Sequence, residues 1–197
     1  MSEGMGETEL PLFPLRTVLF PGGLLPLRIF EPRYVDMVGE CLRANEPFGV
    51  LLIVQGGETG RIGALAEVGT SARVVDFETL PDGLLGLLAR GEQRFRLVER
   101  RVRGNGLHVG QVEWLESPAA PLPAEHEALA EVLRRVLPAM GKTASFLEPH
   151  WDDAGWLANR FAELLPLERD AQQFLLEIAD PLQRLNRLAP LVDTTRL

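Results

Sequence analysis

Apolar and polar residues alternate in short blocks over the first 116 residues and then change to a helical spacing. The stretch 12–34, LFPLRTVLFPGGLLPLRIFEPRY, has a large apolar residue at nearly every second or third position, and four prolines interrupt it. Because proline cannot donate a hydrogen bond to a β-ladder, it favours strand ends and edges. The pattern predicts short strands whose apolar side chains form either a core or an exposed apolar surface.

One helix and one buried strand follow this stretch. Pro32 suits the first position of a helix, where its missing N–H costs nothing, and apolar residues then recur at helical spacing as far as Leu42. The helix is expected to end near Asn45. The continuous apolar run 48–55, FGVLLIVQ, is bounded by proline and glycines and predicts a buried strand.

The segment 69–116 carries the strongest strand signals. Pro81-Asp82-Gly83 and Asn105-Gly106 predict hairpin turns, because glycine accepts a positive φ. Between these turns apolar residues alternate with Arg94 and Arg96, which predicts a half-buried strand with both arginines on its solvated face.

The composition changes after the Pro/Ala-rich stretch 117–125. Four helices are expected beyond it, the last with Asp180 as N-cap and Pro181 in the first position. The others are marked by apolar residues at helical spacing, namely Leu129 to Leu137, Leu157 to Leu165, and Phe174 to Ile178. We therefore predict a β-rich domain over 1–117 and a helical subdomain over 118–197.

Composition and charge narrow the function. Of 197 residues, 46% are hydrophobic and 24% are charged, and no apolar run approaches the roughly 18 residues that a membrane span needs. The N-terminus carries acids where an export signal would carry positive charge, and Cys41 is the only cysteine, so we expect a cytoplasmic protein. A net charge of −8, with neither half basic, argues against nucleic-acid binding, although a local arginine patch stays open.

Two short stretches resemble a phosphate-binding loop and a Ser-Lys dyad, but neither matches its pattern. The stretch AMGKT at 139–143 resembles the end of a phosphate-binding loop, but Val136 stands where that loop needs glycine, and a helix precedes it in place of a strand. Lys142 and Ser145 stand in the reverse of the S-x-x-K order, on an expected loop. We predict no catalytic residues, no cofactor and no enzymatic activity.

For the other polar or reactive residues, a structural role is favoured over a functional one. His150 with Asp152 and Asp153 could hold a hard metal ion, but a helix N-cap at one of the aspartates is favoured, and we predict no metal site. Cys41 is expected to be a small buried hydrophobe. Glu31 and Arg33 flank the helix start, where an ion pair or cap is favoured over a functional role. The arginines between residues 94 and 103 lack the interleaved aromatics of an RNA-binding surface.

Three blocks in order resemble a known family: LPLFPLRTVLFPGGLLPLRIFEPRY, VGTSARVVDFETLPDG and GEQRFRLVE. Together they resemble the N-terminal substrate-binding domain of Lon proteases, and the tail LLPLERDAQQFLLEIADPLQRLNRL is similar to the helical part of that family. The resemblance covers about residues 10–192. It implies an α+β fold, with a PUA-like β pseudo-barrel containing one helix, followed by a C-terminal helical bundle.

The resemblance also implies a function. Since no ATPase motif or Ser-Lys dyad is found, we expect a free-standing, non-catalytic module that recognises unfolded or exposed apolar polypeptide segments, linked to protein quality control and partnered by a separate protease. Phe20, Leu24 and Leu25, around the turn at Pro21, are expected to form an exposed apolar patch. The expected substrate-binding residues are Phe20, Pro21, Leu24, Leu25, Phe30, Arg33 and Tyr34. RNA binding, suggested by the PUA-like fold, a hydrolase activity and a small-ligand site in a cleft between the two parts remain alternatives.

Overall fold

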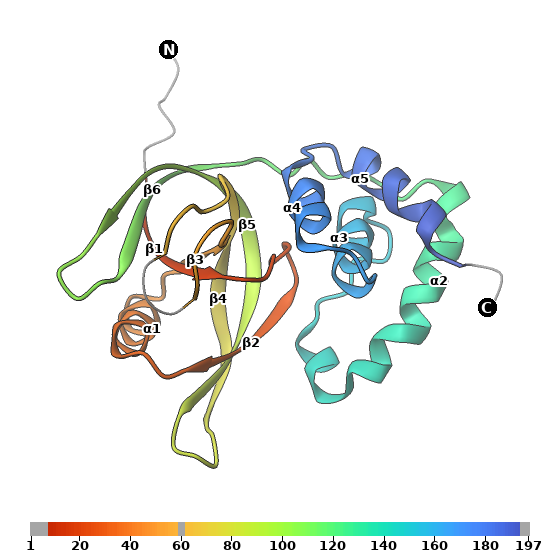
Figure 1. Cartoon of the computed structure of the whole chain (residues 1–197). Coiled ribbons are helices and arrows are strands. Elements are labelled where there is room, and N and C mark those ends of the chain that lie inside the picture. Colours follow the sequence, from red (N-terminus) through yellow and green to blue (C-terminus); the bar gives the residue numbers. More distant parts are fainter. Residues whose placement is uncertain (1–7, 59–61, 194–197) are drawn as a thin grey trace.

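The computed structural model describes residues 8–58 and 62–193, in which six strands and one helix come first and a helical part follows (Figure 1). The strands are β1 (Thr8–Leu15), β2 (Leu24–Ile29), β3 (Phe48–Leu52), β4 (Val68–Thr79), β5 (Leu85–Val102) and β6 (His108–Trp114), and α1 (Pro32–Ala44) lies between β2 and β3. The predicted α+β class is confirmed.

The strands pair in the order β2-β5-β4-β3-β1-β6, and β6 pairs again with β5. The 18-residue β5 makes this return possible: its first half pairs with β2 and β4, and its second half pairs with β6. β1 and β3 are parallel, whereas the other pairs are antiparallel. The ladder that leaves β5 through β4, β3, β1 and β6 therefore returns to β5.

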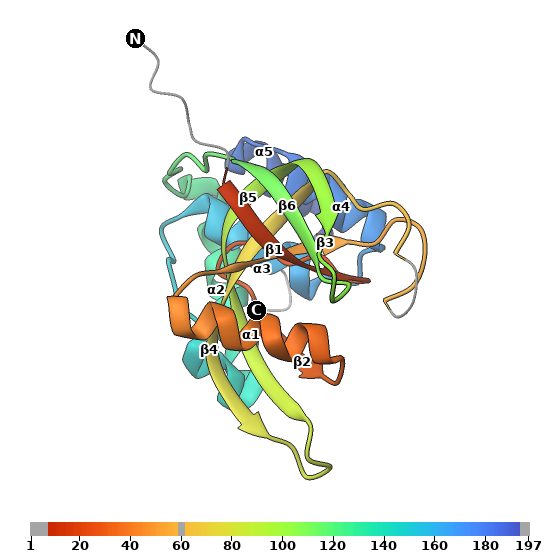
Figure 2. The ribbon, with the colours of Figure 1, turned by 90° about the vertical axis from the view of Figure 1, so that its left-hand side faces the viewer.

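The predicted local signals are found at their positions. α1 begins at Pro32, and Asn45 ends it in the left-handed region with φ 54°. Gly83 and Gly106, both at φ 83°, form the two hairpin turns. α1 packs its buried side across the strands, on the side away from the helical part (Figures 1 and 2).

The helical part contains α2 (Glu127–Val136), α3 (Ala154–Leu164), α4 (Arg169–Glu177) and α5 (Pro181–Leu188), and a 3₁₀ segment, η2 (Leu137–Phe146), follows α2. The predicted N-cap is confirmed at Asp180, whose carboxylate accepts from the amides of residues 182 and 183. The cap expected at Asp152 or Asp153 is Asp153, which accepts from the amide of Trp156 at 2.6 Å. Across the described residues, no helix is both long and apolar enough to cross a bilayer.

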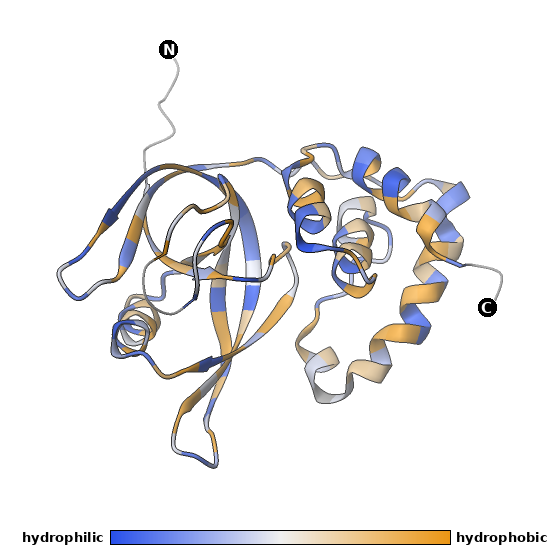
Figure 3. Cartoon of the chain, viewed as in Figure 1, coloured by the Kyte–Doolittle hydropathy of each residue, from blue (hydrophilic) through white to orange (hydrophobic). Residues whose placement is uncertain are grey.

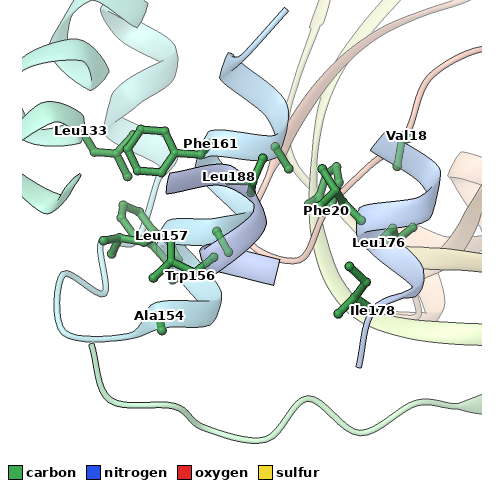
Figure 4. Packing of buried hydrophobic residues seen from close by; sticks show 14 of the residues in the cluster. Val18, Phe20, Leu133, Ala154, Trp156, Leu157, Phe161, Leu176, Ile178 and Leu188 are labelled. Carbon is green, nitrogen blue, oxygen red and sulfur yellow. The ribbon is translucent and has the colours of Figure 1, made fainter. Parts of the chain in front are cut away.

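One hydrophobic cluster joins the sheet to the helices. Val18 and Phe20, from the connection between β1 and β2, pack with residues of α2, α3, α4 and α5. Figure 4 shows Phe20 beside Leu176 and Ile178, at the end of α4. The two parts thus share a core. The boundary between residues 117 and 118 marks a change of structural type, and its status as a domain boundary remains a prediction.

Candidate functional site

An apolar hollow of about 250 Å³ lies where β2 faces the helical part. Leu24 and Leu25, at the start of β2, form one side, and β2 is largely coloured as hydrophobic in Figure 3. The opposite side comes from η2 and α3, including Leu137, Met140 and Leu164. Met140 and Leu164 are 37% and 39% exposed, so the hollow offers apolar surface to solvent.

The turn before β2 is fastened to α3. The Arg160 side chain, 2% exposed, donates from Nη1 to the Gly22 carbonyl at 2.7 Å and from Nη2 to the Pro21 carbonyl at 3.0 Å. The Asn159 amide donates to the same Pro21 carbonyl at 3.2 Å. Gly22 adopts φ 75°, which favours glycine. These bonds fix β2, and with it one wall of the hollow, relative to α3.

An ion pair between a buried arginine and a half-buried glutamate lies in the lining of the hollow. Arg160 and Glu163 lie 3.1 Å apart on α3, and both line the hollow. Burial raises the pKa of the Glu163 carboxyl to about 7, although the Arg160 guanidinium opposes the shift. A Cβ at Gly23 would collide with this carboxylate and would lie 2.9 Å from the Phe20 carbonyl oxygen, and this close approach to the backbone favours glycine. This part of the lining is therefore polar and nearly balanced in charge, and the walls are apolar.

The predicted exposure of Phe20 is wrong. Its ring is 0% exposed, because the chain folds back so that Phe20 points between the sheet and α4. Pro21 is half-buried and lies beside the turn that Arg160 holds. Leu24 and Leu25 are half-buried and line the hollow. Their role in binding stays a prediction.

The other predicted site residues do not line the hollow. Phe30 is 58% exposed just before α1. Arg33 forms an ion pair with Glu31 at 2.6 Å and donates to the Gly106 carbonyl at 2.9 Å, as the structural interpretation of this pair expected. Tyr34 is buried, 4% exposed, and stacks on Phe13 with ring centroids 4.1 Å apart, so little of its ring is open to a client.

Two further arginines, Arg94 and Arg184, are buried and donate to backbone carbonyls of the helical part, and the sequence did not predict this. The expectation that Arg94 faces solvent is wrong: it is 1% exposed and donates to the carbonyls of Leu176 and Ile178 at 2.9 and 3.1 Å. Arg184, 4% exposed, donates to the carbonyls of Leu175 and Ile178 at 2.8 and 2.5 Å. No sequence signal identifies these arginines, because their acceptors are backbone carbonyls brought together by folding.

The residues that the sequence suggested for catalysis, phosphate binding or metal binding lie on different elements. Cys41 is 5% exposed, and burial raises its thiol pKa to about 11. Gly141, in the stretch that resembled a phosphate-binding loop, lies inside η2 at φ 64°, and the Lys142 side chain is outside the described part of the structure. Among the residues that the structure describes, no three His, Cys, Asp or Glu side chains gather where they could hold a metal ion.

The known proteins to which this chain is similar are Lon proteases and their N-terminal domains. The family model of the ATP-dependent protease La (LON) substrate-binding domain matches residues 9–194. The Lon protease of Xanthomonas oryzae is 33% identical, over 94% of this chain and 23% of that protein, and the Escherichia coli Lon protease is 28% identical over 94% and 25%. The chain thus spans about a quarter of the length of the curated relatives it matches.

Two solved structures are similar. A Lon N-terminal domain protein from Xanthomonas campestris superimposes with a TM-score of 0.77 at 42% identity, covering 94% of this chain and 99% of that one. The N-terminal domain of a Mycobacterium avium complex Lon protease has a TM-score of 0.60 at 19% identity, covering 93% and 97%, and shares the fold.

Proposed function

The chain belongs to the family of LON substrate-binding domains, and we propose that it binds apolar segments of other polypeptides in the hollow between β2 and the helical part. The proposed role is recognition without catalysis, and it serves a protease that acts on the bound client. The closed circuit of strands supports describing the β-rich part as a PUA-like pseudo-barrel.

One observation carries this proposal: apolar surface remains uncovered at the junction of two parts that otherwise share a well-buried core. A bound segment that buries one leucine-sized side chain there gains roughly 1.5–3 kcal/mol gross. Association and ordering costs offset much of this gain, so binding is expected to be weak and tolerant of sequence. Those are the properties that recognition of many unfolded clients requires.

Charge substitution on the open wall tests the proposal. Met140→Glu and Leu164→Glu each place a carboxylate in the hollow at a residue that is already partly exposed, so folding is expected to survive. Val136→Glu is the matched control, because Val136 is 42% exposed and does not line the hollow. Binding to a labelled, permanently unfolded protein, such as reduced and carboxymethylated α-lactalbumin, is measured by fluorescence anisotropy.

The two hollow variants are expected to weaken binding at least about fivefold. An apolar segment that covers an ionised carboxylate removes its water and offers no hydrogen bonds in return, which costs free energy. The Val136→Glu control should bind as the wild type does. Equal binding by all four proteins would place the client elsewhere and refute this site. RNA binding stays a prediction, and the buried arginines, which donate to backbone carbonyls, offer no observation in its favour.

A further inference from the structure

A second hollow, of about 660 Å³, lies beside the first along β2. Residues 24 and 25 border the first hollow, and residues 26 and 27 border the second. β2, β5 and β4 form its floor, and residues 143–146 of η2 form its rim. An extended segment that lies along β2 would therefore pass from one hollow into the other.

Strand register places carboxylates and apolar side chains on the same face of this floor. Asp76 of β4 is opposite Leu88 of β5, which is in turn opposite Pro26 of β2. Glu78 is two residues along β4 from Asp76, so it shares that face. Leu80 lies over Gly86 on this side, next to Glu78. The surface combines apolar groups with two carboxylates.

Among the side chains that the structure describes, no cation pairs with either of these two carboxylates. Asp76 accepts a hydrogen bond from the amide of Phe77 at 2.9 Å, and Glu78 has no ion pair within residues 8–58 and 62–193. The nearby arginines are otherwise engaged, since Arg28 pairs with Asp82 and Arg90 pairs with Glu148. Both side chains are exposed, and a carboxylate attracts positive charge.

From this arrangement we propose that the second hollow selects client segments in which a lysine or arginine lies about two to four positions from an apolar residue, on either side of it. The residues of β2 that border the two hollows are one to three positions apart, and Asp76 lies across β5 from β2, so an extended client that runs along β2 needs a spacing of this order. The inference rests on the proposed function: the apolar residue occupies the first hollow, and the cation lies against Asp76 and Glu78 in the second.

Three labelled peptides of equal length test the proposal. Each carries the same apolar core, with lysine, glutamine or glutamate placed three positions before it and three positions after it, so that either chain direction is tested. Because exposed ion pairs contribute little individually, the lysine peptide should bind roughly three- to tenfold more tightly than the glutamine peptide, and the glutamate peptide should bind least. Raising the salt concentration should reduce the difference, since salt screens exposed charges.

The double variant Asp76→Asn/Glu78→Gln should lose this preference while keeping its affinity for the glutamine peptide. Glu99→Gln/Glu113→Gln is the matched control, because it removes two exposed acids from β5 and β6, outside both hollows, with the same change in net charge. A preference that persists in the double variant, or that disappears equally in the control, would overturn the proposal.

The outcomes separate this inference from the proposed function. If no peptide binds, the apolar hollow itself is not a client site. If all three bind equally, the first hollow binds clients and only the selection by charge is refuted. Sedimentation velocity tests whether a second copy of this chain occupies the second hollow instead. If the wild type is a dimer and the double variant is a monomer, the second hollow is a dimer interface and the proposal is wrong.

Discussion

Replacing Phe20 by alanine is expected to destabilise the whole chain strongly. The ring is fully buried and lies in the cluster that joins the sheet to the helices, next to residues of α4. Truncating a buried phenylalanine to alanine costs about 3–5 kcal/mol, from lost transfer free energy and from the cavity left behind. Domains of this kind are stable by only about 5–15 kcal/mol, so this one ring accounts for a large share of the total.

Urea denaturation measures this loss. With a denaturant dependence of about 1–3 kcal/mol/M, the midpoint should fall by roughly 1–5 M urea. Circular dichroism reports mainly the helices, and tryptophan fluorescence reports Trp114 at the end of β6 together with Trp151 and Trp156, of which Trp156 lies in the same cluster as Phe20. Since the sheet and helices share this cluster, both probes should give the same lowered midpoint.

Phe30→Ala is the control, because the two residues have the same chemistry and Phe30 is 58% exposed. Its free energy of unfolding should change by less than about 0.5 kcal/mol. A Phe20→Ala protein with an unchanged midpoint but weaker client binding would show that the ring is at the surface, as its apolar sequence neighbourhood suggested. The reasoning from the shared core would then be wrong.

Three further outcomes are expected. Arg94→Met should cost about 1–3 kcal/mol in urea denaturation, because it leaves buried backbone carbonyls without donors, whereas Arg96→Met on the exposed side should be nearly neutral; equal effects would contradict the assigned burial. The pKa of Glu163 is raised from 4.5 to about 7, so the folded state binds more protons between these values, and stability falls as pH rises through that window. Glu163→Gln should therefore gain stability relative to the wild type, by on the order of 1–3 kcal/mol between pH 4.5 and 8, and a pH-independent difference would argue against the raised pKa. Cys41 should resist a thiol reagent such as DTNB in the native protein and react at once in urea, because the thiol is buried and burial raises its pKa to about 11; rapid native labelling would refute its burial.

Local signals predicted the elements well. Pro32 and Asn45 mark the two ends of α1, the glycines at 83 and 106 mark the hairpins, and Asp180 marks the start of α5. Each depends on the conformational preference of a few neighbouring residues, so each can be recognised without knowledge of the rest of the chain. The order of the blocks was also sufficient to identify the family, which the comparisons confirm.

The candidate site was only partly predicted. Leu24 and Leu25 do line the hollow, but Phe20, in the same apolar stretch, is buried. A run of apolar residues indicates that their side chains will be covered, but it does not identify the segment that covers them. Here residues more than a hundred positions later in the chain cover Phe20 and leave the start of β2 partly open.

The sequence by itself determined the strands, the helices, their caps and turns, and the family, because these are set by local preference and by residue order. Tertiary structure alone decided which arginines are buried, since Arg94, Arg160 and Arg184 acquire their carbonyl acceptors only when distant segments meet. It also decided where apolar surface remains open. Burial is a property of two surfaces in contact, and the sequence specifies each surface without stating which one will cover it.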